Sequence, residues 1–195
     1  MIRLAEISDA GPIARVYEPN VSNSKVSFEL VPPTEAEMEG RIVSALSFAP
    51  WLVCVRDGDV LGYAYASKHR ERAAYQWSVD VAVYVHERHR RHGIGHALYA
   101  SLFALLRLQG FYAAHAGIAL PNPGSVGLHE ALGFRLVGVY PLVGFKLGAW
   151  HDVGWWQLAL RERVGTPAPP LTLPEARRDP GWGAAIEAGL PLLRL

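Results

Sequence analysis

Cysteine, net charge and long apolar runs are all scarce in this sequence, and each scarcity excludes a class of protein. The 195 residues include one cysteine, Cys54, so no disulfide can form within the chain. Cys54 lies in the apolar run 51–55, which predicts a packed core position rather than a nucleophile. The net charge of +1 gives no support for nucleic-acid binding through bulk electrostatics. No apolar run approaches the ~20 residues of a membrane span.

The start of the chain lacks the pattern of a secretory signal. Arg3, Glu6 and Asp9 interrupt the first ten residues, where a signal peptide would carry an apolar segment. Hydrophobic residues make up 50% and charged residues 19%, which is typical of a globular chain. We therefore expect a cytoplasmic protein with neither a membrane nor a nucleic acid as partner.

Hydrophobic patterning predicts alternating strands and helices over most of the chain. We expect strands at residues 2–7, 51–56, 60–68, 75–85, 113–120, 134–140 and 153–160. Helices are expected after Asp9, from the capping box at Thr34 to about Phe48, over 94–109, and after Asn122. The strand, helix and strand over 80–120 imply a parallel crossover. The expected architecture is a mixed α/β sheet with helices on both faces.

The composition shifts at Val164. Residues 165–170 read Gly-Thr-Pro-Ala-Pro-Pro, which is typical of a linker, and the remaining tail offers only a short helix around 182–188. We predict one domain over 1–163, followed by a Pro-rich linker and C-terminal tail over 164–195.

The stretch from Asp80 to Gly110 carries the strongest functional signal. An apolar strand ends at Val85, and the loop 86–92 then supplies three arginines and three histidines before Gly93-Ile94-Gly95. Glycines at a helix start let a ligand approach the backbone and its free N–H groups. Those groups, the helix dipole and the adjacent arginines favour a phosphate.

Several alternatives for this loop fail on spacing. A P-loop would need a lysine after the second glycine, and a dinucleotide fingerprint would need a third glycine where Leu98 stands. Histidines at 86, 89, 92 and 96 have helical spacing, but three precede the glycines and no cysteine or carboxylate completes the set. We therefore expect no metal. What remains is the pattern Arg90-x-x-Gly93-x-Gly95 between a strand and a helix.

This pattern resembles the acetyl-CoA loop of the GCN5-related N-acetyltransferases (GNAT), which is Arg/Gln-x-x-Gly-x-Gly/Ala. Leu120-Pro-Asn122 and the segment 125–134 are similar to the second half of that fold. The segments 75–85 and 144–157 resemble the phosphinothricin N-acetyltransferase subfamily. The resemblance covers about residues 2–163. It implies a GNAT fold, with a mixed, mostly antiparallel sheet, a central parallel strand pair and helices on both faces, and it also implies a homodimer.

Acetyl-CoA is the cosubstrate that the resemblance implies. Backbone groups of the strand around Tyr84 would pair with the pantetheine arm, and the loop 90–96 would hold the pyrophosphate. Asn122 and Ser125 join this set in the family, although both residue types are also ordinary helix caps. The predicted coenzyme residues are Val83, Tyr84, Val85, Arg90, Arg91, His92, Gly93, Ile94, Gly95, His96, Asn122 and Ser125.

Two residues are candidates for the chemistry. An alkyl amine is mostly protonated at pH 7, since its pKa is ~8 for an α-amino group, so acetyl transfer requires a base. Asp80 stands where most phosphinothricin acetyltransferases have Glu, and it is either this base, acting directly or through water, or a structural aspartate. His129, in the place of a Tyr in the wider family, is an acid for the leaving thiolate, a base partner to Asp80, or a packing residue.

The acceptor side is less defined. Phe28, Arg72, Tyr75 and Trp77 match family positions near the substrate, with a solvated loop charge as the alternative for Arg72. Glu29 stands where phosphinothricin enzymes can have Arg, which opens the site to methionine sulfoximine or sulfone. An aromatic-rich group lines the pocket, forms a dimer interface or packs a corner; it comprises Lys146, Trp150, His151, Trp155 and Trp156.

The expected reaction is therefore acetyl transfer to the α-amino group of a small amino acid or its analogue, by direct attack in a ternary complex. Two alternatives stay open at this stage. One is the same chemistry on a protein N-terminus or lysine, and the other is an acetyl-CoA-binding module without turnover.

Overall fold

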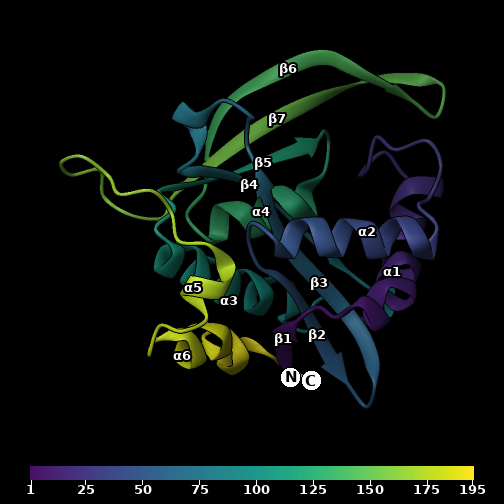
Figure 1. Ribbon diagram of the computed structural model, residues 1–195. Coiled ribbons are helices and arrows are strands. Elements are labelled where there is room, and N and C mark those ends of the chain that lie inside the picture. Colours follow the sequence, from purple (N-terminus) through teal and green to yellow (C-terminus); the bar gives the residue numbers. More distant parts are fainter.

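The computed structural model describes residues 1–195 and places seven strands in one sheet (Figure 1). The order across the sheet is β1-β2-β3-β4-β5-β7-β6. The strands are β1 (Ile2–Leu4), β2 (Trp51–Arg56), β3 (Asp59–Lys68), β4 (Ser78–Val85), β5 (Ala113–Ala119), β6 (Arg135–Lys146) and β7 (Ala149–Ala159). All neighbours are antiparallel except β4 and β5, which pair in parallel. The expected fold class is confirmed.

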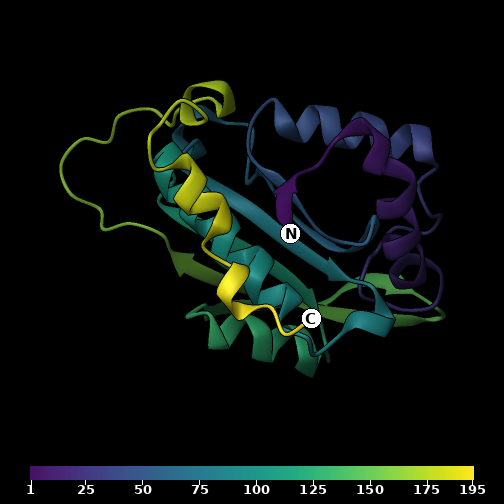
Figure 2. The ribbon, with the colours of Figure 1, turned by 90° about the horizontal axis from the view of Figure 1, so that it is seen from below.

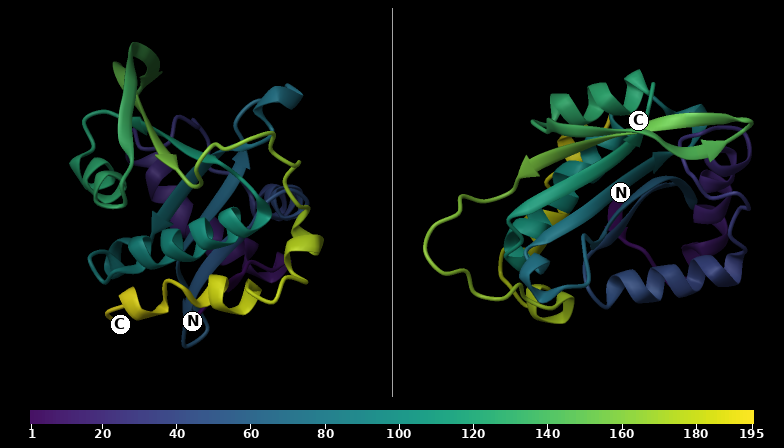
Figure 3. Two further views of the ribbon diagram at one scale, coloured as in Figure 1. Left: turned by 90° about the vertical axis from the view of Figure 1, so that its left-hand side faces the viewer. Right: turned by 90° about the horizontal axis from the view of Figure 1, so that it is seen from above.

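Helices cover both faces of the sheet (Figure 3). α1 (Ala10–Ser22) and α2 (Glu35–Leu46) lie on one face, and α3 (Ile94–Gln109) and α4 (Pro123–Ala131) lie on the other. Each face has its own apolar core, with 24 buried residues on the α3 side and 12 on the α1 and α2 side. Burial on both faces explains why β2 and β4 are almost continuously apolar in the sequence. None of the helices is both long enough and apolar enough to span a bilayer.

β4 and β5 separate soon after they meet. Their pairing covers only Ser78–Asp80 of β4 and Ala113–His115 of β5. Beyond Asp80, β4 has no neighbouring strand on that side, so its backbone groups are available to an extended ligand. The separation also leaves a cavity of about 60 Å³, into which α4 contributes Ser125 and His129. This opening in the middle of the sheet positions the candidate site.

The C-terminal tail runs along α3, as Figure 2 shows. It contains α5 (Leu173–Ala176), α6 (Trp182–Glu187) and the 3₁₀ helix η4 (Leu190–Leu192). The Ser101 hydroxyl of α3 donates to the Ile186 carbonyl at 2.7 Å and accepts from the Gly189 N–H at 3.0 Å. Leu173 is buried, and Trp182 and Leu190 pack against the larger core. The tail is therefore packed onto the fold, and a domain boundary at residue 163 stays a prediction.

Three strand boundaries differ from expectation. β1 ends at Leu4, because residues 7–9 form the 3₁₀ helix η1 (Ile7–Asp9). β4 begins at Ser78 rather than at residue 75, because the 3₁₀ helix η2 (Ala73–Tyr75) precedes it. β6 and β7 form one long hairpin around Leu147-Gly148, where the sequence pattern predicts two short strands and a loop. Two register shifts in this hairpin break the apolar alternation, so the sequence pattern does not reveal the full length of the strands.

Candidate active site

A cleft of about 500 Å³ lies between the end of β4, the start of α3 and α4. Every predicted coenzyme residue except His92 lines it. These residues are Val83, Tyr84, Val85, Arg90, Arg91, Gly93, Ile94, Gly95, His96, Asn122 and Ser125. The carbonyl of His92 instead accepts a hydrogen bond from the backbone N–H of Arg194 in the tail, at 3.0 Å. The sequence thus anticipated a set of residues that the structure brings to one cleft.

The loop before α3 has the backbone conformation of an anion site. After the 3₁₀ helix η3 (Glu87–His89), Arg91 and Gly93 adopt positive φ angles of 66° and 78°. The first N–H groups of α3 have no acceptor within the helix and line the cleft beside two arginines. A side chain on Gly93 would collide with the Leu192 carbonyl oxygen of the tail, so this position requires glycine for space as well as for φ.

Asn122 caps α4, and its side-chain oxygen accepts from the Ser125 N–H at 3.1 Å. The two readings of these residues, helix cap and coenzyme contact, are compatible because both residues also line the cleft.

His129 is buried, with 3% of its surface exposed, and both ring nitrogens have partners. Nδ1 lies 2.7 Å from the Ser125 carbonyl oxygen and therefore carries the proton, while Nε2 accepts from the Tyr99 hydroxyl at 3.0 Å. Burial lowers the pKa of His129, which keeps the ring neutral at pH 7. His129 does not contact Asp80, so the geometry favours the packing role among the three open alternatives.

Asp80 lies at the point where β4 and β5 part, opposite Ser67 of β3 and His115 of β5. Burial raises the pKa of its carboxyl group, and a hydrogen bond from His69 opposes that rise. The distance from Asp80 Oδ1 to His69 Nδ1 is 2.7 Å. Nothing in the spacing of the sequence singles out His69 as a partner, because the contact depends on how β3 and β4 align.

His115 completes this cluster from β5. Its ring centroid lies 4.3 Å from that of His69, and its Nδ1 atom is buried without a hydrogen-bond partner. Burial first, and then the positive charge of neighbouring side chains, lower the pKa of His115 to about 4. Ligand atoms of His69, Asp80 and His115 lie within 4.8 Å of one another, which is close enough to hold a metal ion. At 2.7 Å, His69 Nδ1 and Asp80 Oδ1 form a hydrogen bond.

A second cleft, of about 510 Å³, lies between α2 and the sheet on the face that carries Asp80. Ser67, the cross-strand partner of Asp80, forms part of its wall, together with Tyr17, Arg41 and Tyr65. The cleft therefore extends from the surface towards the candidate base. Sequence reasoning did not identify Arg41, since an arginine on an amphipathic helix carries no distinguishing pattern.

Glu29 is held by several partners at the mouth of this cleft. Arg41 donates to its two oxygens at 2.7 and 2.8 Å, and the Tyr17 hydroxyl donates to Oε1 at 2.8 Å. These contacts lower the pKa of Glu29, the Arg41 hydrogen bonds contributing most. The Lys146 ammonium donates to the backbone carbonyls of Val21, Ser27 and Glu29 and fixes the loop.

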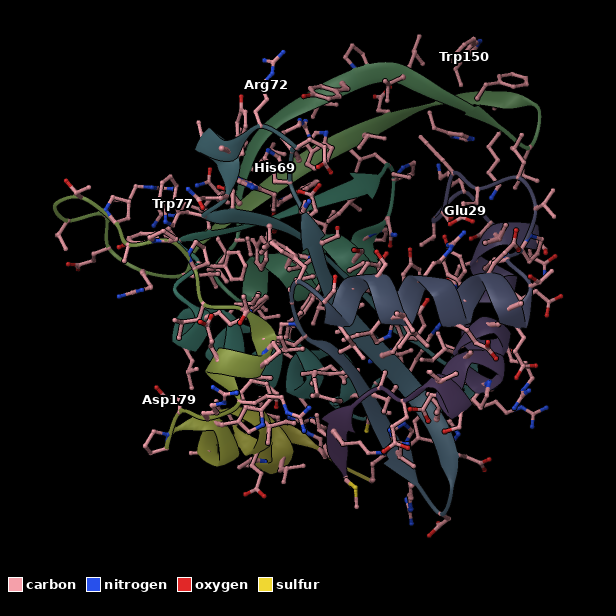
Figure 4. All side chains as sticks on the ribbon, in the orientation of Figure 1. Glu29, His69, Arg72, Trp77, Trp150 and Asp179 are labelled. Atoms are coloured by element: carbon pink, nitrogen blue, oxygen red, sulfur yellow. The ribbon has the colours of Figure 1, made fainter.

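The four predicted substrate residues are not brought to one place. Phe28 packs over Gly144 of β6, and a side chain at Gly144 would collide with its ring. Tyr75 lies beside His69, with ring centroids 6.0 Å apart. Arg72 lies at the outer edge of the molecule, and Trp77 lies beside the linker, where its indole donates to the Ala168 carbonyl at 2.8 Å (Figure 4).

Comparisons with known proteins agree with this geometry. Residues 24–134 match the acetyltransferase (GNAT) family. The chain is 40% identical over 169 residues to the phosphinothricin N-acetyltransferase of Streptomyces viridochromogenes, covering 87% of this chain and 90% of the relative. It is 31% identical over 168 residues to the L-methionine sulfoximine/L-methionine sulfone acetyltransferase of Salmonella typhimurium, covering 86% and 98%.

A solved structure extends the comparison to a bound coenzyme. The GNAT superfamily phosphinothricin acetyltransferase of Sinorhizobium meliloti, in complex with acetyl-CoA, superimposes with a TM-score of 0.82. It is 36% identical, over 86% of this chain and 92% of that one.

Proposed function

The chain belongs to the acetyltransferase (GNAT) family, and we propose that it transfers acetyl from acetyl-CoA to the α-amino group of a small amino acid or analogue. The transfer is a direct attack in a ternary complex. Phosphinothricin, methionine sulfoximine and methionine sulfone are the acceptors to test first, since the relatives are named for them.

The observation that carries this proposal is that the coenzyme cleft continues into the small cavity at the opening between β4 and β5, where Asp80 is the last paired residue of β4. The cleft and the small cavity at the opening share Val83, Tyr84 and Ser125 as lining residues. Acetyl-CoA extended along the free edge of β4 would direct its thioester from the glycine loop towards this cavity. An acceptor amine in the α2 cleft would approach from the face that carries Asp80.

The residues divide the chemistry between them. The loop 90–96 neutralises the pyrophosphate, and the backbone of Val83 and Val85 aligns the pantetheine arm. The amine nitrogen forms a bond to the acetyl carbon, the carbon–sulfur bond breaks, and the amine proton passes to a base built on Asp80. His129 and Tyr99 form a neutral, hydrogen-bonded wall at the thioester end of the cavity.

Glu29 points to a preference for acceptors of lower charge. Arg41 is the arginine of the α2 cleft, and its guanidinium is already paired with Glu29. The cleft therefore offers little uncompensated positive charge to a second acidic group on the acceptor. Among the three candidates we propose methionine sulfone or sulfoximine ahead of phosphinothricin. None of the four predicted substrate residues lines this cleft, although Tyr75 lies beside His69 and Phe28 precedes Glu29 in the chain.

A homodimer is the proposed assembly. The hairpin of β6 and β7 exposes a row of apolar side chains: Leu136, Val137, Val139, Tyr140, Leu142, Val143, Phe145, Leu147 and Trp150. Trp150 lies near the tip of this hairpin (Figure 4). Exposed apolar surface of this kind favours association, and a second copy of the chain is the occupant that the resemblance implies. Light scattering should then give twice the chain mass of 21.4 kDa.

Free-thiol release from acetyl-CoA tests the proposed activity. The acceptors are phosphinothricin, methionine sulfoximine, methionine sulfone, the common amino acids and a lysine peptide. Release with a small amino acid supports the proposal, and release with the peptide alone favours a protein acetyltransferase. Acetyl-CoA binding without release from any acceptor leaves the non-catalytic module. Without acetyl-CoA binding the proposal fails altogether.

A further inference from the structure

His69 and Asp80 form a polar pair on the acceptor side of the sheet. Asp80 pairs across the strands with Ser67, and His69 follows two residues later, so its side chain returns to the same face. The His69 Nδ1 atom lies 2.7 Å from Asp80 Oδ1. The side chains are 17% and 29% exposed, respectively. The remaining nitrogen, His69 Nε2, has no protein hydrogen-bond partner and is not among the buried unpartnered atoms.

Together with His69, Asp80 can act on an acceptor amine that its own short side chain does not reach. Aspartate is one methylene shorter than the glutamate that the resemblance leads us to expect at this position. The imidazole, bonded to the carboxylate through Nδ1, presents Nε2 on its far side as a proton acceptor. A carboxylate on one nitrogen fixes the tautomer and stabilises the imidazolium that forms when the other nitrogen takes a proton.

The surroundings of His69 also suit a transient cation. Three aromatic rings flank it, with centroids 4.3 Å away for His115, 6.0 Å for Tyr75 and 6.3 Å for Trp155. His115 is uncharged at neutral pH, so it does not repel a positive charge on the His69 ring.

The charged groups near His69 come from several elements. Asp80 is the nearby acid, from β4. Arg70 is the nearest cation in the same loop, but its guanidinium donates to the His69 carbonyl, and Arg163 acts on His115 from beyond β7. The net environment is one carboxylate in contact with the ring and two more distant arginines.

We propose that His69, held by Asp80, accepts the proton of the acceptor amine. This inference rests on the proposed acetyltransferase function. As the amine nitrogen bonds to the acetyl carbon and the carbon–sulfur bond breaks, one N–H proton moves to His69 Nε2. The product is an amide, the imidazolium is paired with the Asp80 carboxylate, and the thiolate of coenzyme A is protonated by solvent.

The test compares His69→Gln with wild type, using the acceptor that gives the highest rate. We expect kcat to fall at least 100-fold while the Kd for acetyl-CoA stays within about twofold, which also shows that the variant is folded. Wild-type kcat/KM should rise with pH as the base loses its proton, and the variant should lack this limb. Added imidazole should restore part of the activity of His69→Ala. Lys68→Gln, which changes an exposed side chain next to His69 in the chain, should keep the wild-type rate and profile.

Several results would overturn the inference. One such result is a His69→Gln enzyme whose kcat is within fivefold of wild type and whose pH profile keeps the same limb. If Asp80→Asn is inactive in the same assay, the carboxylate itself accepts the proton. Loss of wild-type activity in EDTA and its return with Zn²⁺ would show that the cluster serves a metal instead. A wild-type protein inert towards every acceptor would overturn the proposed function along with this inference, whereas the first two results leave that function intact.

Discussion

Arg41 of α2 and Glu29 in the loop after α1 form a two-point ion pair, with nitrogen–oxygen distances of 2.7 and 2.8 Å. Both side chains are more than a third exposed, so the pair adds little to stability. Its consequence is electrostatic, because it neutralises the arginine of the α2 cleft.

Glu29→Gln should therefore shift the preference of the enzyme towards acceptors that carry a second acidic group. The amide still accepts from the Tyr17 hydroxyl but leaves the Arg41 guanidinium uncompensated. We expect the ratio of kcat/KM for phosphinothricin to that for methionine sulfone to rise about three- to tenfold, equivalent to about 0.7–1.4 kcal/mol. Steady-state kinetics with both acceptors measures the ratio. Glu39→Gln makes the same charge change on α2 without this ion pair and should leave the ratio unaltered; an equal rise in both variants would contradict the prediction.

His129→Gln should affect stability more than turnover. The change removes the acceptor of the buried Tyr99 hydroxyl, which costs about 1–3 kcal/mol of unfolding free energy. We expect kcat to fall less than tenfold, because a neutral ring with both nitrogens occupied is poorly placed to donate a proton. Tyr99→Phe removes the same hydrogen bond from the other side and serves as the matched variant. A kcat loss of 100-fold or more in His129→Gln alone would indicate an acid catalyst.

Gly93→Ala should weaken acetyl-CoA binding, partly through the tail. A left-handed conformation costs an L-residue about 1–2 kcal/mol, and the new methyl group also meets the Leu192 carbonyl. We expect the Kd, measured by calorimetry, to rise at least tenfold. The same substitution in a chain that ends at Ala188 should raise the Kd by a smaller factor, because the colliding carbonyl is gone. Equal factors in the two backgrounds would mean that the tail does not constrain the loop.

His115 should make the protein acid-sensitive. Its pKa is about 4 in the folded state and ~6.5 when unfolded, so the unfolded chain binds more protons between these values. The stability contributed by the neutral ring is complete above about pH 6.5 and is lost as the pH falls towards 4. Between pH 7 and 5 the wild type should lose about 1–2 kcal/mol more than His115→Gln, as measured by urea unfolding.

Asp80 acts in the opposite sense, since its raised pKa favours the folded state as the pH falls. It is present in both proteins, so the comparison isolates His115. Parallel pH profiles for the two would show that His115 titrates normally in the folded chain.

The sequence by itself predicted the fold class and most of the residues that line the proposed coenzyme cleft. Apolar periodicity set most strands and helices, and the segment from Asp80 to His96 forms a strand, a loop and a helix start in direct succession. Residues that are adjacent in the chain stay adjacent in space, so a local pattern was enough to identify them. The sequence pattern did not predict the full length of the β6–β7 hairpin, because its register shifts break the apolar alternation by which a strand is recognised.

Only the tertiary structure decided the acceptor side. His69 meets Asp80 because of the register between β3 and β4, and Arg41 meets Glu29 because α2 packs across the sheet. The tail reaches α3 through contacts such as that of Ser101 with Ile186, 85 positions away. Such contacts depend on how packed elements align, and each residue alone is an ordinary polar side chain. The chemistry of the acceptor site is therefore a property of the folded sheet.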